Sequence, residues 1–130
     1  MPKGLENISS GHAVYRWLSS IGAKQPSWFL GSIEGRQNFG AWIGFMAKRL
    51  ANSDFLLQFQ NASDPWEKSK LVGLRISQIR KEYASLSQAE KTELGRQSEI
   101  EFKTGIELLS RDKQTLMQLI SISDPPIPQQ

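Results

Sequence analysis

The chain has 130 residues, of which 38% are hydrophobic and 22% charged, and its formal net charge at pH 7 is +3. Four Trp and six Phe supply the side chains for one packed core, which excludes a disordered chain. The absence of Cys excludes disulfides and thiol catalysis, and no apolar run approaches the ~20 residues of a membrane span. We therefore expect an intracellular protein with no membrane role, nuclear if its source is a eukaryote.

The N-terminal part of the chain predicts two short helical segments. Ser9 or Ser10 is a candidate N-cap for a first helix that ends at Gly22. Its apolar residues follow helical spacing: Val14, Trp17, Leu18 and Ile21. Pro26 then breaks the chain, and residues 28–33 form a short apolar segment of one or two helical turns.

The next predicted helix begins at Asn38, a natural N-cap, and its apolar positions continue as far as Phe59. These positions cover more than one side of the helix, so other elements must pack on several of its faces. Gly40 and Gly44 lie inside it and indicate close contact with a neighbouring helix.

Two further helices have clear start signals. Asp64 is the expected N-cap of a helix over 65–84, with Pro at its first position, where the missing amide costs nothing. A second helix is expected over 88–110, since Ser87 and Glu90 have the spacing of a capping box.

A last helical stretch is expected over 113–122, either as a continuation of helix 88–110 or as a new helix after a kink near Arg111. No strand pattern of convincing length is present. The predicted fold class is therefore all-α.

Few residues suggest chemistry. His12 is the only His and there is no Cys, so we expect no metal site, no cofactor, no catalytic residues and no small-molecule substrate. Residues 1–81 carry eleven Lys and Arg against five Asp and Glu, whereas residues 82–130 carry five against eight. Such asymmetry is typical of a basic face for a polyanion, or of an ordinary solvated surface.

The segment around residues 83–98 resembles the C-terminal half of an HMG box. The positions that match the family pattern are Tyr83, Leu86, Ser87, Glu90, Lys91, Leu94 and Ser98. Residues 38–49 resemble the start of the family's first helix, and residues 64–83 are similar to the related alpha-box of fungal mating-type regulators. The resemblance covers residues 38–110.

The resemblance implies an L-shaped three-helix core within residues 38–123. Residues 1–37 would be a helical extension packed on this core, and residues 124–130 a flexible, Pro-rich tail. The implied function is DNA binding and bending in the minor groove, by a transcription regulator or an architectural factor.

The same resemblance implies a set of DNA-binding residues. Asn38 would approach base edges, and Phe39 or Trp42 would be a wedge between base pairs, although for each aromatic residue taken alone a core position is the favoured alternative. The cations implied at phosphates are Lys48, Arg49, Arg75 and Arg80.

The alternative function is an all-α protein-interaction module, such as an accessory protein or an inhibitor, with no nucleic-acid role. Aromatic residues would then anchor the partner, because Trp and Tyr are enriched in binding hot spots. The candidate anchors are Trp17, Trp28, Phe29 and Trp66. The acidic character of residues 88–110 favours this alternative.

Overall fold

The computed structural model describes residues 11–22, 33–122 and 125–126, and within these ranges the chain forms seven helices and no strand. The predicted all-α fold class is therefore confirmed. The helices are α2 (Gly11–Gly22), α3 (Ile33–Leu50), α4 (Ser53–Asn61), α5 (Pro65–Ala84), α6 (Gln88–Arg96), α7 (Ser98–Leu109) and α8 (Lys113–Ile120).

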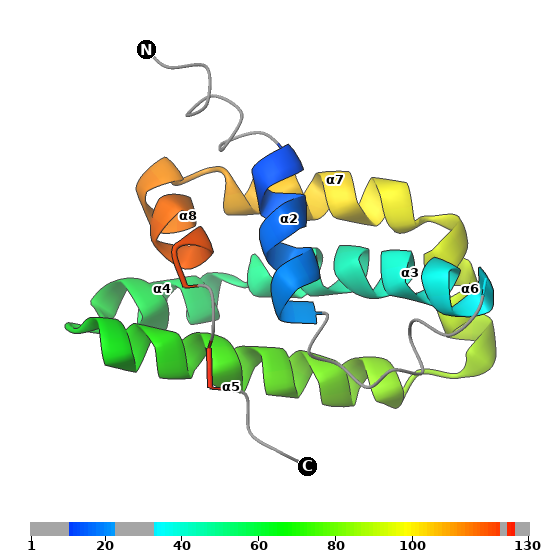
Figure 1. Cartoon of the computed structure of the whole chain (residues 1–130), viewed down its shortest axis with the longest axis horizontal. Coiled ribbons are helices and arrows are strands. Elements are labelled where there is room, and N and C mark those ends of the chain that lie inside the picture. The colour runs from blue at the N-terminus through cyan, green and yellow to red at the C-terminus, as the bar shows by residue number, and fades with distance from the viewer. Residues whose placement is uncertain (1–10, 23–32, 123–124, 127–130) are drawn as a thin grey trace.

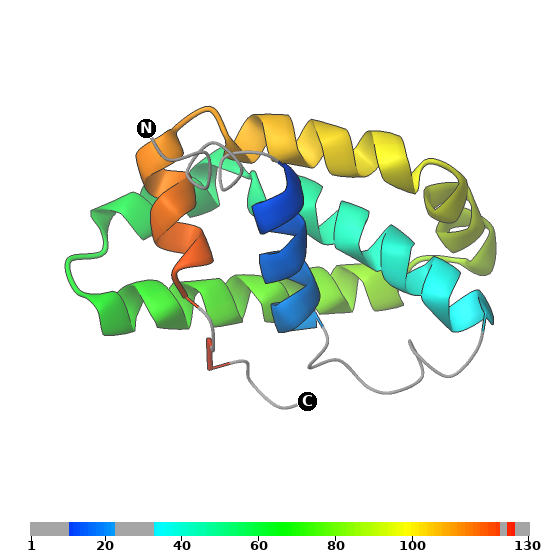
Figure 2. The ribbon, with the colours of Figure 1, turned by 45° about the horizontal axis from the view of Figure 1, so that its top comes forward.

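Three long helices, α3, α5 and α7, lie side by side with α3 in the middle (Figure 1). The chain runs along α3, turns back through α4 into α5, and turns again through α6 into α7. Helices α2 and α8 cross this layer on one face, and α2 contacts α3, α7 and α8 (Figure 2). The L-shaped arrangement implied by the HMG-box resemblance is not confirmed.

Both helix starts predicted in the middle of the chain, those of α5 and α6, are confirmed. Asp64 Oδ1 accepts a hydrogen bond from the Glu67 amide at 3.0 Å, and Pro65 occupies the first turn of α5. At the start of α6, the Ser87 hydroxyl accepts from the Glu90 amide at 3.1 Å, while the Glu90 carboxylate accepts from the Ser87 amide at 2.9 Å. These contacts satisfy backbone donors that a helix start leaves without partners.

Two predicted helices are each divided in two. The helix expected to continue to Phe59 ends at Leu50, because Asn52 caps a new helix by accepting from the Phe55 amide at 2.9 Å. The helix expected over 88–110 is interrupted at Gln97, which lies between α6 and α7 with φ −107° and ψ 13°. The interruption redirects the chain so that α7 lies along α3.

Helix α3 begins at Ile33 and runs without a break through the boundary predicted between residues 37 and 38. Asn38 therefore lies within the helix and is not its N-cap. The predicted N-cap at Ser9 or Ser10 and the apolar residues 28–32 lie outside the described part of the chain. The first predicted helix corresponds to α2, which is described over Gly11–Gly22.

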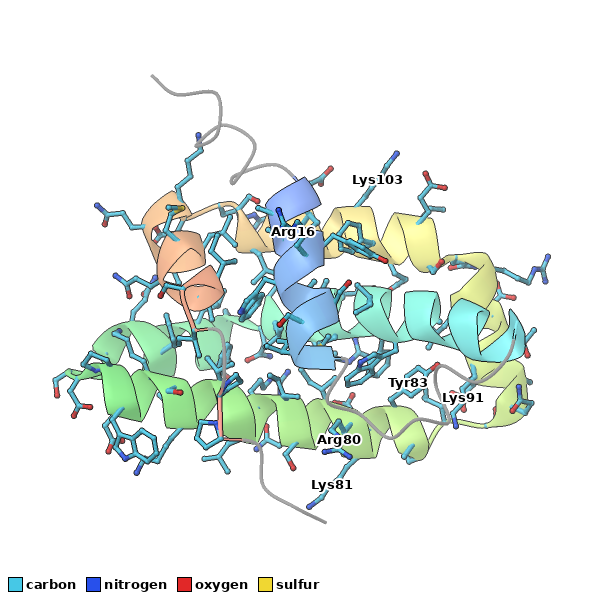
Figure 3. All side chains as sticks on the ribbon, in the orientation of Figure 1. Arg16, Arg80, Lys81, Tyr83, Lys91 and Lys103 are labelled. Carbon is cyan, nitrogen blue, oxygen red and sulfur yellow. The ribbon has the colours of Figure 1, made fainter. Side chains whose placement is uncertain are left out.

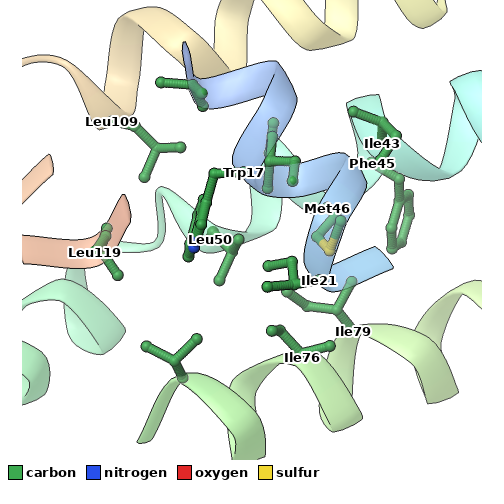
Figure 4. Packing of buried hydrophobic residues seen from close by; sticks show 14 of the residues in the cluster. Trp17, Ile21, Ile43, Phe45, Met46, Leu50, Ile76, Ile79, Leu109 and Leu119 are labelled. Atoms are coloured by element: carbon green, nitrogen blue, oxygen red, sulfur yellow. The ribbon is translucent and has the colours of Figure 1, made fainter. Parts of the chain in front are cut away.

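One hydrophobic core joins α2 to the rest of the molecule. Trp17 and Ile21 of α2 lie among side chains of α3, α5, α7 and α8 (Figure 4). The Trp17 indole Nε1 also donates to the Ile122 carbonyl at 2.7 Å, which ties α2 to the chain after α8. Pro125, in the predicted flexible tail, is buried. Helix α2 is therefore an integral part of the core.

Close approach between α3 and α7 depends on glycine. A Cβ added to Gly105 of α7 would lie 2.7 Å from the backbone of α3 at Ala47 and Lys48. A Cβ added to Gly44 of α3 would lie 3.0 Å from the Ser98 carbonyl oxygen. The close packing predicted for Gly44 is confirmed. At Gly40 it is wrong, since an added Cβ would meet nothing within 4 Å in the described structure.

Because of the capping box, the stability of the fold varies with pH in the acidic range. Hydrogen bonds from the Ser87 amide and hydroxyl lower the pKa of the Glu90 carboxyl below its usual 4.5. The unfolded chain therefore takes up this proton at a higher pH than the folded chain does. The stabilisation is complete above pH 4.5 and is lost as the pH falls through the lower pKa of the folded state.

We expect Glu90→Gln to show a shallower loss of unfolding free energy than the wild type as the pH is lowered from 5 toward the acid range. Urea unfolding at a series of pH values measures this difference. Glu99→Gln, which changes an exposed carboxylate outside the cap, is the control. Parallel stability curves for wild type and Glu90→Gln would contradict the expectation.

Candidate interaction surfaces

The first three residues of the predicted DNA-binding set, Asn38, Phe39 and Trp42, lie on α3. The backbone of Asn38 and Phe39 is helical, and their side chains lie outside the described part of the structure. Trp42 is only 1% exposed and packs edge-on against Tyr83, with ring centroids 5.6 Å apart. Of the two alternatives for Trp42, core or wedge, the structure places it in the core, where its indole is out of reach of a base step.

Two of the predicted phosphate ligands pair with carboxylates of the same chain. Lys48 Nζ lies 3.3 Å from Glu101 Oε1 of α7, and Arg49 Nε lies 3.1 Å from Glu82 Oε1 of α5. The Arg49 guanidinium also lies 4.3 Å from the centre of the Phe45 ring. These cations link the three long helices, and phosphate binding would have to displace their partners.

Arg75 is held against the end of α3. Its Nη2 donates to the Arg49 carbonyl at 2.8 Å, and its Nη1 donates to Gln78 Oε1 at 3.2 Å. Burial lowers the pKa of the Arg75 guanidinium; the charge of Glu82 opposes this shift and that of Arg49 adds to it. Arg75 thus satisfies the last turn of a helix, where carbonyls lack helical partners.

The remaining predicted cation, Arg80, lies near the elbow between α5 and α6. Arg80 and Lys81 extend from the end of α5, and Lys91 extends from α6 beside Tyr83 (Figure 3). Lys91 Nζ lies 5.4 Å from the centre of the Tyr83 ring. Separately, burial raises the pKa of the Tyr83 hydroxyl. Arg80, Lys81 and Lys91 form no ion pair with another described residue. We call these three residues the elbow cations.

An exposed apolar surface lies on α5, away from the core. Trp66 is 61% exposed and Leu74 is 51% exposed, and they lie two turns apart on one side of the helix. Lys70, between them, has its Nζ 5.8 Å from the centre of the Trp66 ring and 3.4 Å from Glu67 Oε1. We call Trp66, Lys70 and Leu74 the Trp66 surface. Among the predicted aromatic anchors, Trp17 is buried, and Trp28 and Phe29 lie outside the described residues.

A groove of about 340 Å³ lies between α4 and α5. Its lining combines opposite charges, amides and apolar side chains: Asn52, Asp54, Phe55, Gln58, Leu71, Leu74, Arg75 and Gln78. Sequence reasoning missed this groove because its residues lie on two helices joined by a turn, and no spacing along the chain brings Asp54 and Arg75 together.

The described residues contain no group of three or more His, Cys, Asp or Glu that could hold a metal ion. No helix in the described ranges is long and apolar enough to cross a membrane. The fold and these surfaces define a small all-α bundle with exposed polar and aromatic features. No protein-family model, curated protein or solved structure matches the chain.

Proposed function

We propose that this chain is a helical protein-interaction module that binds a partner protein through the Trp66 surface. The observation that carries the proposal is the 61% exposure of Trp66 at the capped start of α5. Leaving a large aromatic side chain in water forgoes the free energy of burying it, about 25 cal/mol per Å² of apolar surface. A partner with an apolar pocket would recover that free energy on binding.

The position of Trp66 supports a role as an anchor. The Asp64 cap and Pro65 define the start of α5, so the indole is carried by an ordered backbone and little conformational entropy is lost when it is bound. Leu74 adds apolar surface two turns further along α5, and Lys70 adds a positive charge between the two residues. The surface therefore offers a partner both apolar area and a charge.

The predicted DNA-binding set is less well suited to phosphate. Lys48 and Arg49 have carboxylate partners, Arg75 is bonded to the end of α3, and Trp42 is buried. A protein partner requires none of these contacts to break, because Trp66 and Leu74 are already exposed. This difference favours the interaction module.

We expect Trp66→Ala to weaken partner binding about 30-fold or more, as truncation of a hot-spot Trp does. Partners are first captured from an extract of the source cells with immobilised wild-type protein, and their affinity is then measured with purified components. Ile100→Ala on α7 is the matched control, since Ile100 is 65% exposed and lies outside the Trp66 surface. A partner bound equally by Trp66→Ala and wild type would contradict the proposal.

A second candidate function is DNA binding of the HMG-box type, and the elbow cations favour it. Lys91 lies in the segment that resembles the C-terminal half of that family, and Arg80 and Lys81 lie in the stretch 64–83 that is similar to the alpha-box. None of the three has an ion-pair partner among the described residues. In this candidate the protein would be a nuclear regulator or architectural factor with the L-shaped core of the family.

This candidate predicts affinity for DNA that falls steeply with salt. If each elbow cation neutralises one phosphate, log Kobs should fall with log[salt] with a slope of about −3. Fluorescence anisotropy with linear and four-way-junction DNA at low and moderate salt measures it. Arg80→Glu combined with Lys81→Glu should abolish binding, whereas Lys103→Glu on α7 should not. Absence of binding at low salt would rule this candidate out.

A further inference from the structure

Arg75 has an incomplete set of partners. A guanidinium has five N–H donors, and two of the Arg75 donors bond to the Arg49 carbonyl and to Gln78. Its Nε is buried and has no hydrogen-bond partner in the described structure. Glu82, whose charge favours the protonated guanidinium, is itself bonded to Arg49 Nε. Arg75 is therefore a partly desolvated cation without an ion pair among the described residues.

The opposite charge on the same groove is Asp54, in the first turn of α4. Asp54 and Arg75 both line the groove, yet no salt bridge within 4.0 Å joins them. A positive and a negative group thus line one concave space and do not neutralise each other. A ligand with one group of each sign would neutralise both.

The rest of the lining defines the neutral part of such a ligand. Most of the lining surface is polar: Asn52, Gln58 and Gln78 contribute amide groups beside the two charges, while Phe55, Leu71 and Leu74 contribute a smaller apolar area. Polar groups of this kind fix the orientation of a ligand in a small-molecule site. The groove, at about 340 Å³, lies near the lower end of the usual range for such sites.

We propose that the groove between α4 and α5 binds a free α-amino acid with an apolar side chain. Arg75 binds the ligand's carboxylate, Asp54 binds its ammonium group, and Leu71 and Leu74 pack against its side chain. The site is independent of the proposed function. It shares only Leu74 with the Trp66 surface, and neither Asp54 nor Arg75 belongs to that surface.

The test is isothermal titration of the whole protein with L-leucine, together with two derivatives that each lack one charge. We expect saturable 1:1 binding of L-leucine with a Kd on the order of 1 mM, typical of a ligand this small. N-acetyl-L-leucine, which lacks the ammonium group, and L-leucinamide, which lacks the carboxylate, should each bind about tenfold more weakly or worse.

Two variants test which residue binds each charged group of the ligand. Asp54→Asn should lose L-leucine binding about tenfold or more, and because Asp54 is exposed its fold should be unchanged. Arg75→Lys keeps the charge but loses the planar donor fork, and it should also weaken binding, with urea unfolding confirming that the bundle is intact. Glu67→Gln, an exposed change on α5 outside the groove, is the control and should bind L-leucine as the wild type does.

Binding should also shift backbone amide NMR signals of residues 52–58 and 71–78 and leave those of α7 in place. Absence of saturable L-leucine binding would overturn the proposal. Equal binding of N-acetyl-L-leucine would overturn the role of Asp54, and equal binding of L-leucinamide would overturn that of Arg75.

Discussion

Replacing Trp42 by alanine should lower the free energy of unfolding by about 3–5 kcal/mol, the usual cost of removing a large aromatic side chain from a core. Trp42 is 1% exposed and packs against Tyr83, which in turn packs against Phe45 at a centroid distance of 5.4 Å. Removing the indole leaves a cavity at the contact between α3 and α5. Urea unfolding followed by far-UV circular dichroism measures the loss.

Trp66→Ala is the matched control, because it removes the same side chain from an exposed position. We expect its effect on stability to stay within about 0.5 kcal/mol, as for most surface substitutions. A Trp42→Ala variant as stable as Trp66→Ala would contradict the core position of Trp42. If that variant also lost DNA binding, the wedge interpretation would be favoured instead.

Replacing Gly105 by alanine should cost about 1–3 kcal/mol, although alanine is intrinsically the better helix former. The added Cβ would lie 2.7 Å from Ala47 Cβ and equally close to backbone atoms of α3, so whole helices have to move apart. Helices α3 and α7 would lose the packing that depends on their close approach. Thermal and urea unfolding both report the loss.

Gly95→Ala provides the control on the neighbouring helix. A Cβ at Gly95 would meet nothing within 4 Å in the described structure. Gly95→Ala should therefore raise stability by about 0.5–1 kcal/mol, since alanine loses less conformational entropy in a helix. Equal effects of the two substitutions would show that α3 and α7 do not meet at Gly105.

The elements predicted correctly are those with a local chemical signal. Asp64, Pro65, Ser87 and Glu90 define helix starts through contacts that span three residues, so neighbouring sequence is sufficient to identify them. The interruptions at Asn52 and Gln97 were missed because the apolar pattern continues across both. At Asn52 a side-chain cap prevails over that pattern, and at Gln97 the packing of α7 on α3 does.

The candidate sites were less predictable than the fold. The sequence made Trp66 a candidate anchor and Arg80 a candidate phosphate ligand, but it could not separate Trp66 from Trp17, which is buried. It placed Lys48, Arg49 and Arg75 at phosphates, whereas their partners Glu101, Glu82 and the Arg49 carbonyl come from other helices or distant turns. Such partners cannot be read from the spacing of charges in one helix.

The sequence by itself determined the all-α class, the start and end of α5, and the capped start of α6, because each depends on propensity and on hydrogen bonds between near neighbours. Only the tertiary structure decided that Trp17 is buried and joins α2 to one continuous core, that Trp42 is buried while Trp66 is exposed, and that Asp54 and Arg75 line one groove. These outcomes depend on which helix faces meet, and that is settled by packing over the whole chain, including the close contact at Gly105.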